Sequence, residues 1–145
     1  MGHPVLVPVD VEHEESWRLA MPAAQAEARR RGAELHLIAV LPDFGMSIVG
    51  QFFPKGFSED VIHTTHQALE KIAAEMLGDT VTWKAHVHQG EVTETILSHA
   101  AKLHAGLIVM AAHAPGERGF LAGTHADRVV ARAECSVLVV RAGTA

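Results

Sequence analysis

The sequence is poor in the features that mark secreted, membrane-spanning and nucleic-acid-binding proteins. It has a single cysteine, Cys135, which cannot form an internal disulfide. Its apolar runs all fall short of the roughly 20 residues that are needed to cross a bilayer, and its first residues lack the charged and apolar regions of a secretory signal. A net charge of −5 disfavours a partner held through nucleic-acid phosphates. We therefore expect a cytoplasmic protein with no membrane span and no nucleic-acid partner.

The bulk properties that are present indicate one globular domain. The chain has 145 residues, of which 48% are apolar and 20% are charged. This length is typical of a domain with one hydrophobic core, and the composition is that of a folded protein. We expect residues 1–145 to form a single domain.

Segments with strand patterning alternate with segments of helical periodicity along the whole chain. The expected strands are residues 4–9, 34–40, 80–88, 107–110 and 136–140, and the expected helices are residues 14–31, 58–77, 92–104 and a last one from Thr124. Such alternation implies right-handed crossovers between parallel strands. The sequence therefore predicts an α/β fold, an open parallel sheet with helices on both faces. Pro22 lies inside the first helix and is expected to kink or split it.

Sheets of this kind bind ligands beyond the carboxyl ends of the strands, where the strand order reverses. If the first and fourth strands are neighbours, that crevice is lined by residues 8–10, 39–41 and 110–124. We expect Val9 and Val40 to flank a base. Asp10 would accept a hydrogen bond from the base or ribose, or hold Mg²⁺ through water, and it would otherwise cap the following turn.

A phosphate site is expected where the last helix begins. Gly123 precedes backbone N–H groups of Thr124, His125 and Ala126 that would face an anion, and the Thr124 hydroxyl adds a donor. A plain helix cap at Thr124 is the alternative. The other expected lining residues are Pro8, Ala39, Met110, Ala111, His113 and Arg118.

Metal and catalytic sites are not expected. His86 and His88 share a strand face and His63 and His66 share a helix face, but no third ligand follows at a recognisable spacing. No catalytic triad is visible. Cys135 has no neighbouring base, so we expect it to pack as a small apolar residue.

Several motifs together make the chain resemble the universal stress protein (UspA) superfamily over essentially its whole length. They are VLVPVD at 5–10, GAELHLIAV at 32–40, Gly90, GLIVMAAH at 106–113, GT at 123–124 and AECSVLVVR at 133–141. The resemblance implies a five-stranded sheet in the order 3-2-1-4-5, dimerisation and, in many members, binding of ATP or AMP. Pairing of the edge strand 136–140 with its copy would give the homodimer.

The loop at 112–116, AHAPG, resembles a subgroup that reads Ser-His-Arg-Pro there, and His113 matches that pattern. It departs from the usual Gly-x-x-Gly motif because Ala111 and Ala114 replace the two glycines. Ala114 also stands where the subgroup has arginine, and losing an arginine–phosphate bond costs ~1.5–3 kcal/mol. Arg118 would compensate if the loop folds back.

Two main functional hypotheses follow. In the first, the protein binds ATP or AMP, with or without Mg²⁺, and acts as a stress-response regulator with at most slow incidental hydrolysis. In the second, the crevice holds no nucleotide and the chain is an interaction module for a protein such as a transporter or stress factor. A flavin binder is a third and weaker reading. The apolar segment 44–57 is expected to form a lid over the nucleotide slot or a dimer contact, with a membrane or transporter contact as the alternative.

Overall fold

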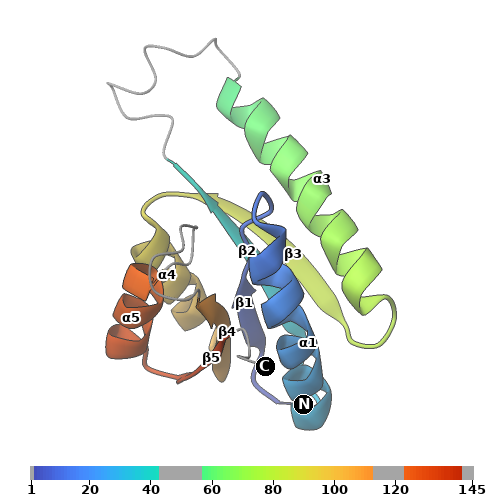
Figure 1. Ribbon diagram of the computed structural model, residues 1–145, viewed down its shortest axis with the longest axis vertical. Helices are drawn as coiled ribbons and strands as arrows, with labels where there is room; N and C mark the ends of the chain where they lie inside the picture. The colour runs from blue at the N-terminus through green and yellow to red at the C-terminus, as the bar shows by residue number, and fades with distance from the viewer. Residues whose placement is uncertain (1, 43–56, 113–122, 142–145) are drawn as a thin grey trace.

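The computed structural model describes residues 2–42, 57–112 and 123–141 (Figure 1). These residues form one parallel sheet in the strand order β3-β2-β1-β4-β5, with helices on both faces. The strands are β1 (Val5–Pro8), β2 (Leu35–Leu41), β3 (Trp83–Gln89), β4 (Leu107–Ala112) and β5 (Ser136–Arg141). The predicted fold class and strand order are therefore confirmed.

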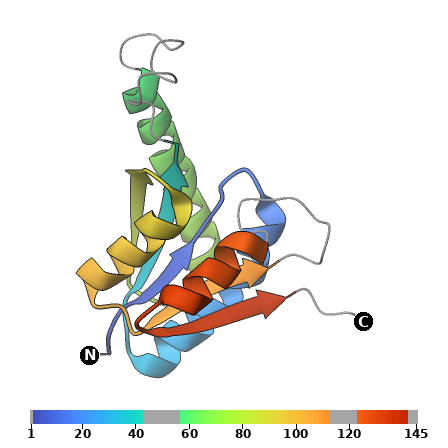
Figure 2. The same ribbon diagram turned by 90° about the vertical axis from the view of Figure 1, so that its left-hand side faces the viewer.

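Helices α1 (Glu14–Arg31) and α3 (Phe57–Leu77) cover one face of the sheet, and α4 (Val92–Leu103) and α5 (Gly123–Arg132) cover the other (Figures 1 and 2). The central strands β1, β2 and β4 are buried along almost their whole length because helices cover both of their faces. In the described part of the chain, no helix is both long and apolar enough to cross a membrane.

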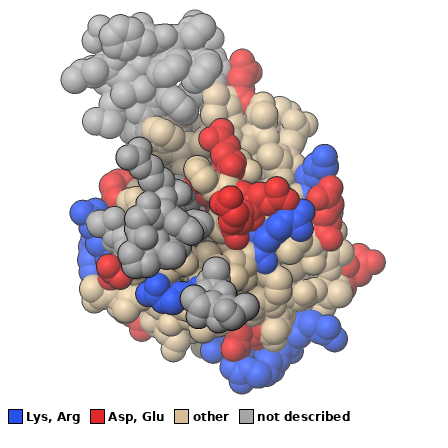
Figure 3. All heavy atoms as spheres, viewed as in Figure 1, with Lys and Arg blue, Asp and Glu red and all other residues tan. Residues whose placement is uncertain are grey.

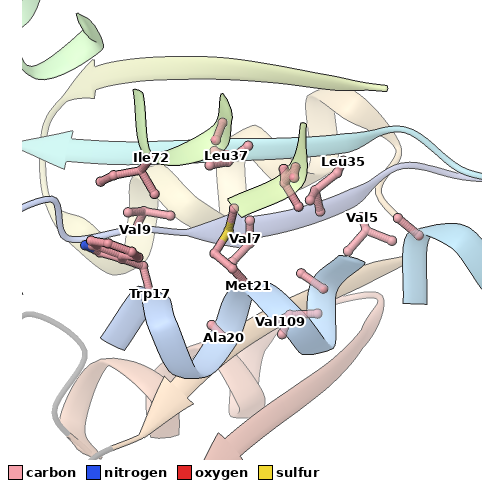
Figure 4. Close-up of a cluster of buried hydrophobic side chains, with 14 of the residues drawn as sticks. Val5, Val7, Val9, Trp17, Ala20, Met21, Leu35, Leu37, Ile72 and Val109 are labelled. Carbon is pink, nitrogen blue, oxygen red and sulfur yellow. The ribbon is translucent and has the colours of Figure 1, made fainter. Parts of the chain in front are cut away.

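The sheet separates two hydrophobic clusters. On the α1/α3 face, Trp17 and Met21 of α1 pack with Val7 and Val9, and Ile72 of α3 closes the cluster (Figure 4). On the other face, Ile96 and Val129 pack onto Leu6, Ile108 and Met110. Successive residues of each central strand thus belong alternately to the two clusters, and this alternation fixes the register of the sheet.

Left-handed residues end three of the helices. Gly32 follows α1 with φ 60°, and Gly78 follows α3 with φ 53°. His104 takes the same conformation after α4 with φ 54°, and its N–H bonds to a carbonyl of the last turn.

Pro22 does not interrupt α1, so the predicted split of this helix is wrong. The missing N–H leaves the carbonyl of Arg18 without its helical donor, but Pro22 lies on the exposed side of the helix. Water can therefore satisfy that carbonyl, and the buried side of α1 keeps its bonds.

Strand β3 begins at Trp83, three residues later than predicted. The reason is Thr80, whose hydroxyl donates to the carbonyl of Leu77 at 2.6 Å and accepts from Gln25 of α1 at 2.5 Å. Thr80 therefore closes the turn after α3 instead of starting the strand.

Candidate functional site

The strand order reverses between β1 and β4. These strands are parallel neighbours, with Val5 beside Leu107 and Leu6 beside Ile108. The chain leaves β1 for α1 on one face of the sheet and leaves β4 toward α5 on the other. The helices that follow the two strands thus lie on opposite faces of the sheet, and we call the region at the carboxyl ends of β1 and β4 the carboxyl-end crevice. It is the place where such sheets bind ligands.

Asp10 stands just beyond β1 at this crevice, and only 14% of its side chain is exposed. Its Oδ1 accepts from the N–H of Glu12 at 3.1 Å, and its Oδ2 lies 2.6 Å from Nδ1 of His13. Asp10 therefore caps the turn, which was the alternative to the predicted ligand contact. Each carboxylate oxygen has more than one lone pair, so this role does not prevent ligand contact.

The predicted apolar lining residues lie together at the crevice but face opposite sides of the sheet. Val9, Ala39 and Ala111 belong to the α1/α3 cluster, whereas Val40 and Met110 belong to the α4/α5 cluster. All five are buried, as is Pro8. The side chains of Val9 and Val40 thus cannot flank one base together, because the sheet lies between them. Val9 is 1% exposed and would meet a ligand only through its main chain.

Helix α5 begins at Gly123, one residue before the predicted start at Thr124. The other three helices carry acidic side chains in the first turn, Glu14 and Glu15 in α1, Glu59 and Asp60 in α3, and Glu94 in α4. The first turn of α5 has no acidic residue. Its partial positive charge is thus not offset by a carboxylate of its own.

The residues after Gly123 divide between core and surface. Ala126 is 3% exposed and packs in the α4/α5 cluster. The His125 ring lies against the start of α4, with Nδ1 3.4 Å from the hydroxyl of buried Thr93. The Thr124 side chain lies outside the described atoms, and His113, Arg118 and the segment 43–56 lie outside the described residues.

A second group of functional side chains lies between β2, β3 and α4 on the α4/α5 face. His86 and His88 of β3 and His99 of α4 each present a ring nitrogen, and these nitrogens lie within 4.8 Å of one another. His36 of β2 joins them through its Nδ1, which is 2.8 Å from Nε2 of His86. We call these four residues the histidine cluster. The sequence pattern revealed the pair on β3 but not His99, because only the crossover of α4 brings that side chain to the strand.

The surroundings of His86 and His99 favour the neutral forms of these two rings. Burial lowers the pKa of His86 to about 4, with the neighbouring His36 and His88 acting in the same direction. Burial also lowers the pKa of His99 to about 4, again with His86 and His88 contributing. Near neutral pH both rings are uncharged, and each has one nitrogen with a free lone pair.

The other histidine pair from the sequence lies on the opposite side of β3. His66 of α3 contacts Glu70 through Nδ1 at 3.1 Å and the carbonyl of Ala85 through Nε2 at 3.2 Å. His63 is an exposed residue of the same helix. Among the described residues, the three-ligand group consists of His86, His88 and His99, and His63 and His66 are not part of it.

A cavity of about 580 Å³ opens at the amino ends of the strands, away from the carboxyl-end crevice. Leu97, Ala100 and Ile108 form part of its apolar wall, and Cys135 lies at its edge. Burial raises the pKa of the Cys135 thiol, and the residue packs against the α4/α5 cluster. The predicted packing role of Cys135 is therefore confirmed.

Comparison with known proteins places this fold and motif set in one family. The model of the universal stress protein family matches residues 1–141. Universal stress protein G of Shigella flexneri is 29% identical over an alignment of 139 residues that covers 94% of this chain and 97% of that protein. A universal stress protein of Thermus aquaticus, encoded in the QAH/OAS sulfhydrylase 3′ region, is 34% identical in an alignment that covers 84% of this chain and 88% of the Thermus protein.

A solved structure from the same group supports the fold. The universal stress protein of Archaeoglobus fulgidus in complex with dAMP has a TM-score of 0.70 at 21% identity, over 94% of this chain and 96% of that one. The family match over nearly all of the sequence, together with the shared strand order, leads to one conclusion: the chain belongs to the universal stress protein family.

Proposed function

We propose that this protein binds an adenine nucleotide, ATP or AMP, in the carboxyl-end crevice and acts as a regulator in a stress response. A relative of the same fold, the Archaeoglobus fulgidus protein, was solved in complex with dAMP. The reversal of strand order between β1 and β4 supports this proposal, because parallel sheets bind ligands where the strand order reverses.

The observation that carries the proposal is the first turn of α5. This turn starts at the crevice with Gly123 and is the only first turn among the four described helices without an acidic side chain. The backbone N–H groups of a helix's first turn and the positive end of the helix dipole suit a phosphate, and no carboxylate of this turn competes for them. The nucleotide phosphates would lie here, with the base toward β1 and β2.

Asp10 fits the role of a polar contact for the ribose or for a hydrated Mg²⁺ ion. Its carboxylate is held in place by Glu12 and His13. A carboxylate that is already oriented loses little conformational freedom on binding. The nucleotide is proposed as a signal that changes the protein's contacts with partners, and any hydrolysis is incidental.

The proposal is tested by adding a negative charge to the first turn of α5. The change Thr124→Asp should remove binding of AMP and ATP because the carboxylate repels phosphate. The same carboxylate at a helix N-terminus stabilises a fold by about 0.3–1 kcal/mol. Binding and stability should thus change in opposite directions, which separates loss of the site from loss of the fold. Ala26→Asp, which adds the same charge on the exposed side of α1, is the matched control and should bind normally.

Mass spectrometry of ligand released from the purified protein by denaturation identifies the natural occupant. An adenine nucleotide supports the proposal. Equal binding by wild type and Thr124→Asp would place the ligand elsewhere. If wild type binds neither nucleotide at millimolar concentration, the interaction module without nucleotide is the better account.

A further inference from the structure

The histidine cluster lies away from the proposed phosphate site and has no part in the proposed nucleotide chemistry. His86 and His88 are two residues apart on β3, so their side chains share the face that α4 covers. The wall opposite them is α4, and His99 projects from it toward both rings. Ring centroids lie 4.5 Å apart for His86 and His99 and 4.7 Å apart for His88 and His99. In Figure 2, α4 is seen in front of this part of the sheet.

We infer that His86, His88 and His99 form a binding site for a divalent transition-metal ion of the Zn²⁺ type. Imidazole nitrogens are among the preferred ligands of Zn²⁺, Ni²⁺ and Cu²⁺. The three ligating nitrogens lie within 4.8 Å of one another. In a tetrahedral zinc site this separation is about 3.3 Å, since each nitrogen is about 2.0–2.1 Å from the metal. Side-chain movements of about an ångström would close the difference.

The unpartnered nitrogen of His99 is an independent sign of a missing ligand. Nε2 of His99 is buried and has no hydrogen-bond partner. A buried polar atom without a partner costs about 1–3 kcal/mol, so such atoms are uncommon in folded proteins. A metal ion bound between the three rings would give this nitrogen its partner.

His36 provides the kind of support that metal-binding histidines receive from a second layer of residues. Its side chain is 5% exposed, and its Nδ1 is 2.8 Å from Nε2 of His86. When Nε2 of His86 donates this bond, Nδ1 of His86 keeps a free lone pair for the metal. Nε2 of His36 then carries a proton, and Oε1 of Glu34 lies 3.8 Å away, beyond hydrogen-bond distance. The contact between His36 and His86 alone would orient the ligand ring.

The site is open on one side. His88 and His99 line a cleft of about 320 Å³ together with Gln89, Ser98 and Lys102. Three protein ligands with an open fourth position are typical of zinc sites that hold water or a small ligand. The Lys102 ammonium opposes a bare cation but favours a metal whose fourth ligand is hydroxide or another anion. The glutamate in this cleft, Glu94, is paired with Arg132.

Metal binding is tested on the full chain after removal of any affinity tag and treatment with a chelator. Calorimetric titration with ZnCl₂ should show one ion bound per chain, and Zn²⁺ should raise the melting temperature. Co²⁺, titrated in the same way, should give the intense visible absorption of tetrahedral coordination. His88→Gln and His99→Gln should each weaken Zn²⁺ binding at least about tenfold, because losing a ligand costs no less than losing a supporting residue.

His63→Gln is the matched control, since it removes an exposed histidine from α3 and should leave the affinity unchanged. His88 is exposed as well, so its variant keeps the test valid if His99→Gln does not fold. The inference is overturned if wild type binds no Zn²⁺, Ni²⁺ or Co²⁺ at submillimolar concentration. It is also overturned if His63→Gln lowers the affinity as much as His88→Gln does. Neither result bears on nucleotide binding, which the titrations with AMP and ATP measure separately.

Discussion

At the scale of single residues, the start of α4 depends on Glu91 and Gly90. Glu91 is the N-cap of this helix, and its carboxylate accepts from the N–H of Glu94 at 2.7 Å. That backbone hydrogen bond lowers the pKa of Glu91, and the charge of His125 acts in the same direction. A glutamate at this position replaces the shorter side chains that usually cap helices.

The change Glu91→Ala should therefore destabilise the protein by about 0.5–1 kcal/mol, near the lower end of capping effects because the side chain is exposed. The lowered pKa means that this contribution is present above pH 4.5 and is lost as the pH falls through the folded-state pKa. Urea unfolding should show a larger difference in stability between variant and wild type at pH 7 than at pH 3. Glu75→Ala, at an exposed site near the end of α3, should not show this pH-dependent loss.

Gly90 holds a backbone conformation that other residues rarely adopt, with φ 147°. A Cβ atom here would also lie 2.7 Å from Oγ1 of Thr95. Gly90→Ala should cost about 1–3 kcal/mol of folding free energy from strain, with the contact adding to it. The double variant Gly90→Ala/Thr95→Ala should recover only the part due to the contact.

Gly32→Ala gives the comparison for Gly90, because Gly32 has φ 60° and no atom within 4 Å of an added Cβ. Its cost should be that of left-handed backbone alone, about 1–2 kcal/mol. Chemical denaturation measures all three variants. Full recovery in the double variant would show that the conformation of Gly90 carries no strain.

The residue scale also shows what sequence reasoning can find. Asp10 was predictable because it follows a buried strand, and its turn-capping role needs only local contacts. His99 was not predictable as a neighbour of His86, since no local pattern reports the rotation and placement of a crossover helix. The side chains of Val9 and Val40 point to opposite faces of the sheet because side chains alternate along a strand. The prediction that both flank one base did not take this alternation into account.

At the scale of elements, β5 is the edge of the sheet next to β4. Ser136 and Leu138 are exposed. Among the described residues, Leu138 is one of two large hydrophobic residues whose side chains are exposed. An exposed edge strand with an apolar side chain is suited to pairing with a second copy. A homodimer through residues 136–140 stays a prediction, and the position of β5 supports it.

The change Leu138→Lys should convert such a dimer to a monomer, because it places a like charge on each side of the two-fold axis. Ala74→Lys adds the same charge to the exposed side of α3 and should leave the assembly unchanged. Sedimentation velocity gives the two masses directly. A wild-type monomer at high concentration, or a Leu138→Lys variant that stays dimeric, would contradict this interface.

Element types were well predicted from sequence, whereas some boundaries were not. Long apolar runs in β2 and β4 and the glycines after α1 and α3 are strong local signals. The late start of β3 depends on the contact of Thr80 with Gln25, a residue that lies on another element. Pro22 is tolerated because its side of α1 faces water. The position of Pro22 in the sequence does not by itself reveal which side of the helix is exposed.

At the scale of the whole molecule, the two proposed sites share one architectural cause. Parallel strands bring all their carboxyl ends to one edge, where the connections to α1, α4 and α5 begin. The strand order was predictable because the resemblance to the universal stress proteins covers the whole chain. Charges of both signs are interspersed on the face shown in Figure 3, in keeping with a modest net charge of −5. A cytoplasmic location stays a prediction.

The central claim is that the carboxyl-end crevice holds an adenine nucleotide, and calorimetric titration of ligand-free protein with AMP and with ATP tests it most directly. The crevice between β1 and β4 and the first turn of α5, free of acidic residues, predict saturable binding of one nucleotide per chain. Binding should be stronger for the nucleotide than for adenosine, because the phosphates meet the helix N-terminus. The absence of a binding isotherm for both nucleotides at millimolar concentration, in protein that is folded by circular dichroism, would contradict the account.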